Sequence, residues 1–394
     1  MQGFEFCCPT KIVCGAHALD KLPDEVADRG MKHPLVMTDA GLVKLGVAAK
    51  LTGVLDAADV PYEVFDQVPP DSSMDVVNEV ARLYAERGCD GFVAIGGGSV
   101  IDTTKGAAAS LACEGVDFAT LQGSEILKAD LPPFIAVPTT AGTGSEVTLV
   151  AVVADTHKHA KLSFTSYKLV PHVAILDPAL TSSLPPKLTA TTGMDALTHA
   201  IEAYISWTYN TKESLRLAEE AVKLIFDNLE LAYQHGEDLK VRENMMIAAF
   251  KAGFAFSRAG VGNVHAIAHT LGGLYNTPHG LANAVILPIV LEDYGEAVYP
   301  KLARLCEIAG VKADGTDAEK AQAFIAEIYA MNERMGIPKG FDFIQEEDIP
   351  QIITWALAEA NPNYPVPVVY NAARCRKVID TIRAKAAENP PAEA

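Results

Sequence analysis

The stretch GNVHAIAHTLGGLYNTPHG, residues 262–280, carries three histidines within fifteen positions: His265, His269 and His279. A second stretch, TTGMDALTHAIEAY, places Asp195 and His199 four positions apart. Residues four apart lie on one face of an α-helix with their side chains about 6 Å apart. Two such helices can therefore enclose one divalent cation with one oxygen and three nitrogens, and the spacing alone does not choose among the three histidines.

Aspartate and histidine without a neighbouring cysteine form a ligand set of intermediate hardness, which suits Fe(II) and also accepts Zn(II) or Mn(II). A lone buried histidine is more often an ordinary core residue. Here, however, four of the ten histidines of the chain fall in two short stretches. The clustering favours a metal site, and room for a substrate oxygen beside these ligands would make that site catalytic.

The composition narrows the class of protein. With 394 residues, of which 49% are hydrophobic, the chain is long enough for two domains. A net charge of −18 without a basic run argues against nucleic acid or an anionic membrane as partner. We find no basic segment followed by a long apolar run at the start and no apolar stretch of about 18 residues, so we expect a cytoplasmic protein.

The first part of the chain alternates short apolar runs with helical patterns. The runs are KIVCG, PLVMTD, YEVFD, GFVAIGGGS, FIAVPTT, VTLVAVVAD and VAILDP. Their apolar character is nearly continuous, which is typical of strands that are covered on both faces of a mostly parallel sheet. We therefore predict a Rossmann-like α/β domain over residues 1–184 that binds a dinucleotide.

After Pro185 and Pro186 the pattern changes to long amphipathic helices. We expect these helices over residues 187–206, 212–233, 240–257, 263–274, 281–308, 317–335, 348–360 and 371–387. Residues 185–394 are therefore predicted to form an all-helical domain that supplies the metal ligands and the substrate pocket. We expect that site to face the α/β domain across a cleft.

Two loops after strands are candidates for binding a nucleotide. The sequence IGGGSVID, residues 95–102, joins a strand to a helix, where glycines and free N–H groups can meet a phosphate. It is not the G-x-G-x-x-G fingerprint, and a tight turn is an equally good explanation. The second loop, PTTAGTGSE at 138–146, offers hydroxyls for phosphate, ribose or amide groups, or is an ordinary polar turn. Ligands bind at the carboxyl edge of such sheets, where both loops are expected.

Two single residues add to this prediction. Asp39 ends a strand, where a carboxylate can accept both ribose hydroxyls and repel a 2′-phosphate, which favours NAD over NADP. An N-cap for a helix over 40–50 is the alternative role. Lys161 can reach a phosphate or the nicotinamide ribose, although an isolated lysine is more often solvated.

Four motifs carry a resemblance to a known family. They are GGGSVIDTTK at 96–105, PTTAGTGSEVT at 138–148, TGMDALTHAIEAY at 192–204 and GNVHAIAHTLGGLYNTPHG at 262–280. Through them the chain resembles the iron-dependent, group III alcohol dehydrogenases over nearly its whole length. The lactaldehyde reductase, 1,3-propanediol dehydrogenase and NAD-dependent methanol dehydrogenase branches are close. The resemblance implies a dehydroquinate synthase-like architecture.

The resemblance also implies roles for individual residues. The metal ligands would be Asp195, His199, His265 and His279, and His269 would lie beside the nicotinamide and the substrate. The pyrophosphate would be bound by Gly97, Gly98 and Ser99. The riboses would be lined by Thr139, Thr140, Thr143 and Ser145, with Lys161 close by, and Asp39 matches the position associated with NAD. Homodimers or higher oligomers are implied, with the segment FCCPTKIVCG at 6–15 pairing across a two-fold axis.

Two positions depart from the family pattern. Val150 stands where some diol-active relatives have a polar residue, and Asn263 replaces a tyrosine that is common just before the first histidine of its motif. We expect both to line the substrate pocket together with Phe256, for which plain helix core is the alternative.

The predicted activity is interconversion of a short primary alcohol and its aldehyde with NAD, with His269 relaying the proton. Arg258, one turn before the metal motif, suggests an anionic aldehyde such as a semialdehyde or sulfoacetaldehyde as the alternative substrate, unless it forms a surface salt bridge. Alternatives from other classes are a metal-dependent hydrolase, a lyase resembling dehydroquinate synthase, and a non-enzymatic metal-binding protein.

Overall fold

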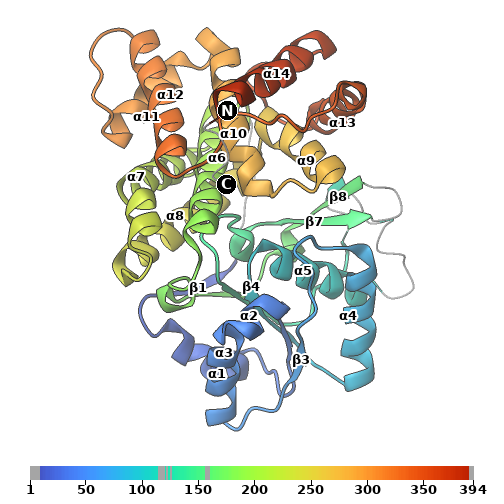
Figure 1. Cartoon of the computed structure of the whole chain (residues 1–394). Helices are drawn as coiled ribbons and strands as arrows, with labels where there is room; N and C mark the ends of the chain where they lie inside the picture. The colour runs from blue at the N-terminus through green and yellow to red at the C-terminus, as the bar shows by residue number, and fades with distance from the viewer. Residues whose placement is uncertain (1–8, 114–119, 121–122, 125–126, 156–159, 390–394) are drawn as a thin grey trace. The chain divides into compact units, whose positions relative to one another are not determined.

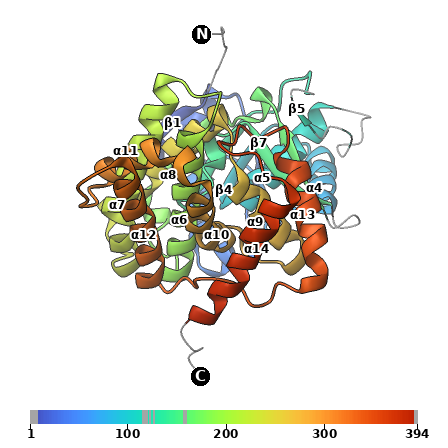
Figure 2. The same cartoon turned by 90° about the horizontal axis from the view of Figure 1, so that it is seen from above.

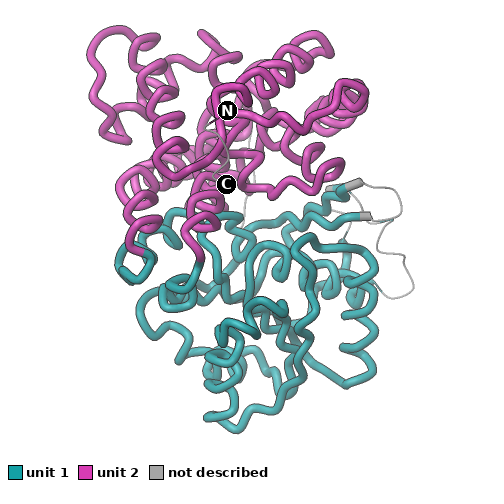
Figure 3. The backbone as a smooth tube through the Cα atoms, in the orientation of Figure 1, with its two compact units in different colours: residues 1–184, 236–250 teal, residues 185–235, 251–394 magenta. Residues whose placement is uncertain are grey.

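The computed structural model describes residues 9–113, 120, 123–124, 127–155 and 160–389. The chain divides into two compact units (Figure 3). The first unit holds residues 1–184 and 236–250, and the second holds residues 185–235 and 251–394. The stretch 236–250, which we assigned to the helical domain, is thus grouped with the first unit. The functional assignment of the two domains stays a prediction.

A six-stranded parallel sheet forms the centre of the first unit. The strand order is β1-β9-β6-β4-β2-β3. The strands are β1 (Lys11–Cys14), β2 (Leu35–Met37), β3 (Glu63–Phe65), β4 (Phe92–Gly96), β6 (Phe134–Pro138) and β9 (Val173–Leu176). The predicted mostly parallel sheet is confirmed. Strand β1 lies at one edge, and residues 6–8 of the expected pairing segment lie outside the described residues.

Successive residues of each strand face opposite cores. In β4, Phe92 and Ala94 belong to one hydrophobic cluster, and Val93 and Ile95 belong to the other. Helices α4 (Met74–Arg87) and α5 (Gly98–Ala112) contribute to the first cluster, and helices α1 (Leu22–Asp28) and α3 (Val47–Ala57) to the second (Figure 1). Covering both faces removes the need for polar residues on either, which is why the strand sequences are continuously apolar.

A second, three-stranded sheet of this unit was only partly predicted: the run VTLVAVVAD indicated the strand at 150–155, and the other two strands were missed. Strands β7 (Val150–Asp155) and β8 (Ala160–Thr165) pair antiparallel, and β5 (Gly123–Ser124) pairs with β8 in parallel. The sequence of β8, AKLSFT, alternates polar and apolar residues and so lacks the continuous apolar run that marked the other strands. The helix expected over 40–50 is also two helices, α2 (Ala40–Lys44) and α3.

The second unit contains only helices among its described residues, as predicted. They are α6 (Pro186–Ile205), α7 (Lys212–Gln234), α9 (Asn263–Tyr275), α10 (His279–Tyr294), α11 (Tyr299–Ala309), α12 (Asp317–Arg334), α13 (Ile349–Ala360) and α14 (Ala372–Lys385). Helix α8 (Leu239–Ala259) begins in residues of the first unit and ends in the second. Helix α6 packs against α7 and α10 (Figures 1 and 2). None of the described helices combines the length and apolarity needed to cross a membrane.

The prediction of a single helix over residues 281–308 is wrong. Helix α10 ends at Tyr294, and α11 starts at Tyr299 after a short 3₁₀ turn, Gly295–Ala297. Gly295 has φ of +56°, a left-handed conformation that stops a helix and that glycine adopts without steric cost. Pro300 then stands in the first turn of α11, where its missing N–H is not needed.

Helix α10 also contains Pro288, which cannot donate a backbone hydrogen bond to the carbonyl of Ala284. The side-chain amide of Asn332 on α12 donates to that carbonyl instead, at 2.7 Å, and all three residues are buried. Asn332 therefore satisfies a buried acceptor that the proline leaves without its helical partner.

We expect Asn332→Leu to lower the free energy of unfolding by about 1–3 kcal/mol, because it leaves the Ala284 carbonyl buried and unsatisfied. Urea unfolding at constant slope measures the change. Asn228→Leu is the matched control, since the Asn228 amide bonds the Leu224 carbonyl at 2.8 Å inside α7, where the helical hydrogen bond also reaches that carbonyl. An equal loss of unfolding free energy in both variants would show that the unsatisfied Ala284 carbonyl is not the cause.

Candidate metal centre

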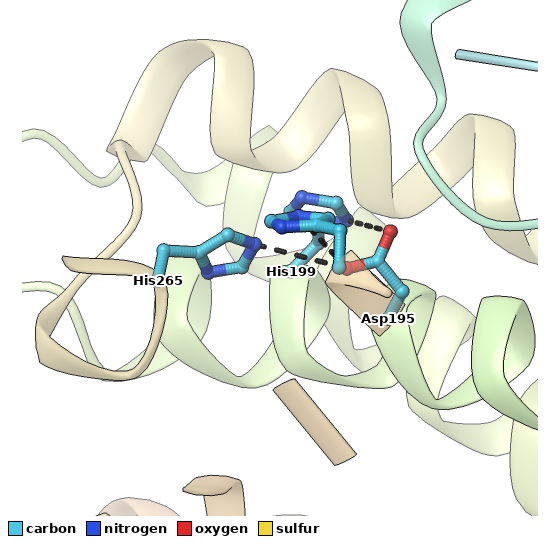
Figure 4. A group of neighbouring side chains, drawn as sticks. Asp195, His199 and His265 are labelled. Carbon is cyan, nitrogen blue, oxygen red and sulfur yellow. Dashed lines mark ion pairs between the residues drawn. The ribbon is translucent and has the colours of Figure 1, made fainter. Parts of the chain in front are cut away.

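Four predicted ligands meet at one place in the second unit. Their ligand atoms all lie within 4.8 Å of one another: Asp195, His199, His265 and His279. Helix α6 supplies the first two, and α9 and α10 supply one each. The first three residues are buried and the His279 side chain is 32% exposed. Figure 4 shows Asp195, His199 and His265 pointing toward one another.

The distances within this group suit a metal ion. The Oδ1 atom of Asp195 lies 3.4 Å from Nε2 of His279 and 3.9 Å from Nε2 of His265. The other carboxylate oxygen, Oδ2, lies 4.0 Å from Nδ1 of His199. Ligand atoms about 2.1 Å from a tetrahedral ion are roughly 3.4 Å apart, so the ligand atoms, which spread up to 4.8 Å apart, would draw together by at most about 1.4 Å around a bound ion.

Asn283, one turn after His279 on α10, provides an independent test of the fit. Its Nδ2 atom lies 2.7 Å from Oδ1 of Asp195 and 3.1 Å from Nε2 of both His265 and His279. A single hydrogen-bond donor therefore meets acceptor atoms of three of the four residues. Lone pairs that converge on one point are what a bound cation requires, so the residues present fit a divalent metal.

The position of His279 depends on a close approach of two helices. A Cβ atom at Gly280 would lie 2.4 Å from the carbonyl oxygen of Thr191 on α6. Glycine therefore allows the start of α10 to approach α6 closely enough for His279 to reach Asp195.

Glu202 orients His265 and was missed by the sequence analysis. Its Oε2 atom lies 2.6 Å from Nδ1 of His265 and accepts from the backbone N–H of Gly262 at 2.8 Å, and Oε1 accepts from Val264 N–H at 2.9 Å. Nδ1 donates to the carboxylate, so Nε2 keeps its lone pair for a metal. Glu202 lies three residues after His199 in the same motif, and this spacing indicated that the two side chains share one face of the helix.

Burial controls the protonation of this pair. It lowers the pKa of the His265 imidazole well below its usual value, which keeps the ring neutral as a metal ligand must be. Burial also raises the pKa of Glu202 to about 8, and the hydrogen bonds from Gly262, Val264 and His265 oppose that rise. With three donors directed at its two oxygens, we treat Glu202 as the charged acceptor of the pair.

His269 is not part of the group of four. Its ring stacks against that of His279 with centroids 5.1 Å apart, and its Nδ1 atom lies 2.6 Å from Oε1 of Glu359 on α13. The structure thus separates the three histidines, which the spacing alone had not done. It groups His265 and His279 with Asp195 and places His269 beside them.

The expected pocket residues of the second unit differ in their surroundings. The ring of Phe256 stacks on His199 with centroids 4.3 Å apart, so it covers one side of that ligand. The Asn263 amide donates to Oη of Tyr294 at 2.9 Å and to the Val368 carbonyl at 3.1 Å, so it is engaged within the helical core.

The two predicted nucleotide loops lie side by side in the first unit. They follow β4 and β6, which are neighbours in the sheet. A Cβ atom at Gly98 would lie 2.7 Å from Cγ2 of Thr143, and one at Gly97 would lie 3.4 Å from the Thr140 side chain. Glycine at position 98 is thus required by the close approach of the other loop. Thr139 is buried beside them at the end of β6, so glycines and hydroxyls gather at one carboxyl edge.

Several of the other expected cofactor residues bond within the protein. Asp39 caps α2 by accepting from Leu42 N–H at 2.9 Å, and it follows β2, the other neighbour of β4. Lys161 Nζ donates to Asp71 Oδ1 at 2.8 Å, Ser99 Oγ donates to the Pro70 carbonyl, and Ser145 Oγ donates to Asp102 Oδ1. Val150, the expected pocket residue of this unit, is half-buried, and its carbonyl accepts from Lys105 Nζ at 2.8 Å. Their roles toward a cofactor or a substrate stay predictions.

Comparison with known proteins agrees with this architecture. The family model described as iron-containing alcohol dehydrogenase matches residues 9–178, and its C-terminal counterpart matches residues 189–382. The chain belongs to the iron-containing alcohol dehydrogenase family, and it is an oxidoreductase of the class that acts on alcohols and aldehydes. The resemblance inferred from the four motifs is confirmed.

Three relatives represent the branches named above. Lactaldehyde reductase of Escherichia coli (strain K12) is 37% identical over 350 residues, covering 87% of this chain and 90% of the relative. NAD-dependent methanol dehydrogenase of Bacillus methanolicus is 36% identical over 347 residues, covering 87% and 91%. The crystal structure of a 1,3-propanediol oxidoreductase has a TM-score of 0.93 at 36% identity, covering 97% and 100%. The predicted dehydroquinate synthase-like fold class is confirmed by such neighbours.

Proposed function

We propose that this oxidoreductase interconverts a short primary alcohol and its aldehyde by transferring a hydride to or from NAD. The observation that carries this proposal is the convergence of Asp195, His199, His265 and His279 on the point where the Asn283 amide meets three of them. Family membership adds the reaction class.

Asp195, His199, His265 and His279 would hold the metal, for which we propose Fe(II), with Zn(II) or Mn(II) as substitutes. When bound, the metal supplies Lewis-acid polarisation of the substrate oxygen, and NAD supplies the hydride chemistry. Glu202 holds a proton on Nδ1 of His265 and so directs Nε2 to the site. Phe256 covers His199 and excludes water from that side.

The proton of the reaction is assigned to His269. Its Nδ1 atom is engaged by Glu359, so Nε2 is the nitrogen that accepts the alcohol proton during oxidation and returns it during reduction.

The loops of the first unit would bind the dinucleotide. We assign the pyrophosphate to Gly97, Gly98 and Ser99 at the N-terminus of α5, and the riboses to Thr139, Thr140, Thr143 and Ser145 with Lys161. The Asp39 carboxylate, at the end of β2, would repel a 2′-phosphate and select NAD. The name of the Bacillus methanolicus relative, an NAD-dependent methanol dehydrogenase, supports that cofactor.

We expect Gly98→Val to weaken NADH binding about 10- to 100-fold, because the new side chain overlaps Thr143 and such overpacking costs about 1–3 kcal/mol. Fluorescence titration with NADH measures the change. Gly53→Val in α3 is the matched control, since a Cβ atom there meets nothing within 4 Å. Unchanged affinity in Gly98→Val would place the pyrophosphate elsewhere.

We keep a neutral substrate as the proposal and an anionic aldehyde as the alternative. The Cζ atom of Arg258 lies 5.8 Å from the ring centroid of Tyr209, so the guanidinium is in cation–π contact. This contact gives Arg258 a role within the protein at the end of α8. We keep Phe256 and Val150 as pocket residues, whereas the hydrogen bonds of Asn263 favour a structural role for that residue.

We further propose a cytoplasmic homodimer or higher oligomer that pairs through the edge strand β1. Unpaired backbone groups of an edge strand are a ready surface for a second copy. Size-exclusion chromatography with light scattering measures the oligomeric state.

The decisive test of the proposed function is an absorbance assay of the Fe(II)-loaded protein with NADH and a series of short aldehydes. We expect aldehyde-dependent oxidation of NADH, faster for neutral than for anionic aldehydes. A lyase of the dehydroquinate synthase kind would bind NAD without net NADH oxidation, and a hydrolase would not need the nucleotide. Either result would overturn the proposal.

A further inference from the structure

We infer that Glu359 and Tyr364 form a positioning pair that holds His269 with its proton on Nδ1 and its Nε2 lone pair free for the reaction. This inference rests on the proposed function, in which His269 exchanges a proton during hydride transfer. All three residues lie in the second unit.

The contacts define which nitrogen carries the proton. Nδ1 of His269 lies 2.6 Å from Oε1 of Glu359, and the hydroxyl of Tyr364 donates to the same oxygen. Burial and the neighbouring Glu359 carboxylate hold the pKa of Tyr364 well above its usual value, so the phenol keeps its proton and donates. A carboxylate can only accept, and therefore the Nδ1 atom of His269 must be the donor.

The chain after α13 is folded so that it brings Tyr364 to Glu359. Glu359 is the second-last residue of α13, and the Tyr364 backbone N–H donates to the Ala360 carbonyl at 2.8 Å. The Asn363 side-chain amide donates to the Glu359 carbonyl at 3.1 Å. These bonds turn the chain back at the helix end, so the tyrosine reaches the carboxylate only five residues after it.

The pair also fixes the orientation of the His269 ring. A hydrogen bond at Nδ1 and stacking against His279 at 5.1 Å together restrict its rotation. The side chains of His269 and Glu359 are 15% and 31% exposed, so water competes weakly for their hydrogen bond. An orienting acceptor of this kind selects the tautomer and stabilises the imidazolium that forms when Nε2 takes the proton.

If the contact between His269 and Glu359 were purely structural, its role would be to link α9 to α13. The protein contains a second hydrogen bond that links these two helices. The hydroxyl of Tyr275, the last residue of α9, donates to Oδ2 of Asp348 immediately before α13. This contact joins the same two helices through the same chemical groups, a tyrosine and a carboxylate, but does not include His269. Tyr275→Phe is therefore the matched control for changes to the pair.

The kinetic arm compares Glu359→Gln, Tyr364→Phe and Tyr275→Phe in the metal-loaded protein with NADH and an aldehyde. We expect Glu359→Gln to lower kcat about 10- to 100-fold, less than the roughly 10²- to 10⁴-fold contribution of a positioned acid–base group, because His269 itself remains. Tyr364→Phe should give a smaller loss, because the carboxylate remains. Metal content and the KM for NADH should stay within about twofold in all three variants. A loss in Tyr275→Phe equal to that in Glu359→Gln would reduce the pair to a structural tie and overturn the inference.

The spectroscopic arm does not depend on activity. In the Zn(II)-loaded protein with ¹⁵N-labelled histidine, the ring shifts of His269, assigned with His269→Gln, report which nitrogen carries the proton. We expect a protonated Nδ1 in the wild-type protein and in Tyr275→Phe, and a mixture of tautomers in Glu359→Gln. A wild-type ring protonated only on Nε2 would overturn the inference. A protein that shows the expected tautomer but oxidises no NADH with any aldehyde would instead reject the proposed function.

Discussion

His265→Ala is expected to remove nearly all metal-dependent turnover, lowering kcat/KM by roughly 10³-fold or more. The imidazole supplies one of the four ligand atoms, and Lewis-acid stabilisation by a bound metal contributes several kcal/mol to such reactions. The variant should also lose metal, which elemental analysis of the purified protein measures. Chelation of the wild-type protein should produce the same loss of turnover while NADH binding is retained.

His235→Ala is the control for this prediction. His235 lies at the C-terminal end of α7 and is exposed, so its loss should leave both metal content and turnover unchanged. Circular dichroism of His265→Ala checks that the helical unit is still folded. Full turnover in protein shown to be free of metal would contradict the mechanism, and full metal content in His265→Ala would exclude this residue as a ligand.

The architecture was largely predictable because the local patterns agree with the tertiary packing. Strands covered on both faces read as continuous apolar runs, and long amphipathic helices follow Pro185 and Pro186. Strand β8 was missed because AKLSFT alternates polar and apolar residues. The break between α10 and α11 was missed because the apolar pattern continues across Gly295 and Pro300, the residues that end one helix and begin the next.

The candidate metal centre was predictable because aspartate and histidine at helical spacing are rare and specific. Its supporting carboxylates were not identified. Glu202 is separated from His265 by 63 positions and Glu359 from His269 by 90. Only the tertiary fold, which places Glu202 at the N-terminal end of α9 and packs α13 against α9, brings each pair together. The spacing alone did not choose between His269 and its two neighbours, since all three histidines share one short stretch. The family resemblance implied that choice, and the structure groups the same four residues without His269.

His269→Gln is the second large prediction. We expect it to lower kcat about 10²- to 10⁴-fold, the usual contribution of a positioned acid–base group, because glutamine cannot exchange the proton. Metal content should remain close to that of the wild-type protein, since the four converging ligand atoms are those of Asp195, His199, His265 and His279. Steady-state kinetics and elemental analysis of the same preparation measure both quantities.

Comparing His269→Gln with His265→Ala separates the loss of a metal ligand from the loss of the proton carrier. The two histidines are one helical turn apart on α9, both donate from Nδ1 to a glutamate at 2.6 Å, and their ring centroids are 5.9 Å apart. A variant effect caused only by disturbing α9 would therefore be similar at both positions. We expect loss of metal at His265 alone and loss of turnover at both. Equal loss of metal in the two variants would make His269 a ligand and would leave the reaction without its assigned proton carrier.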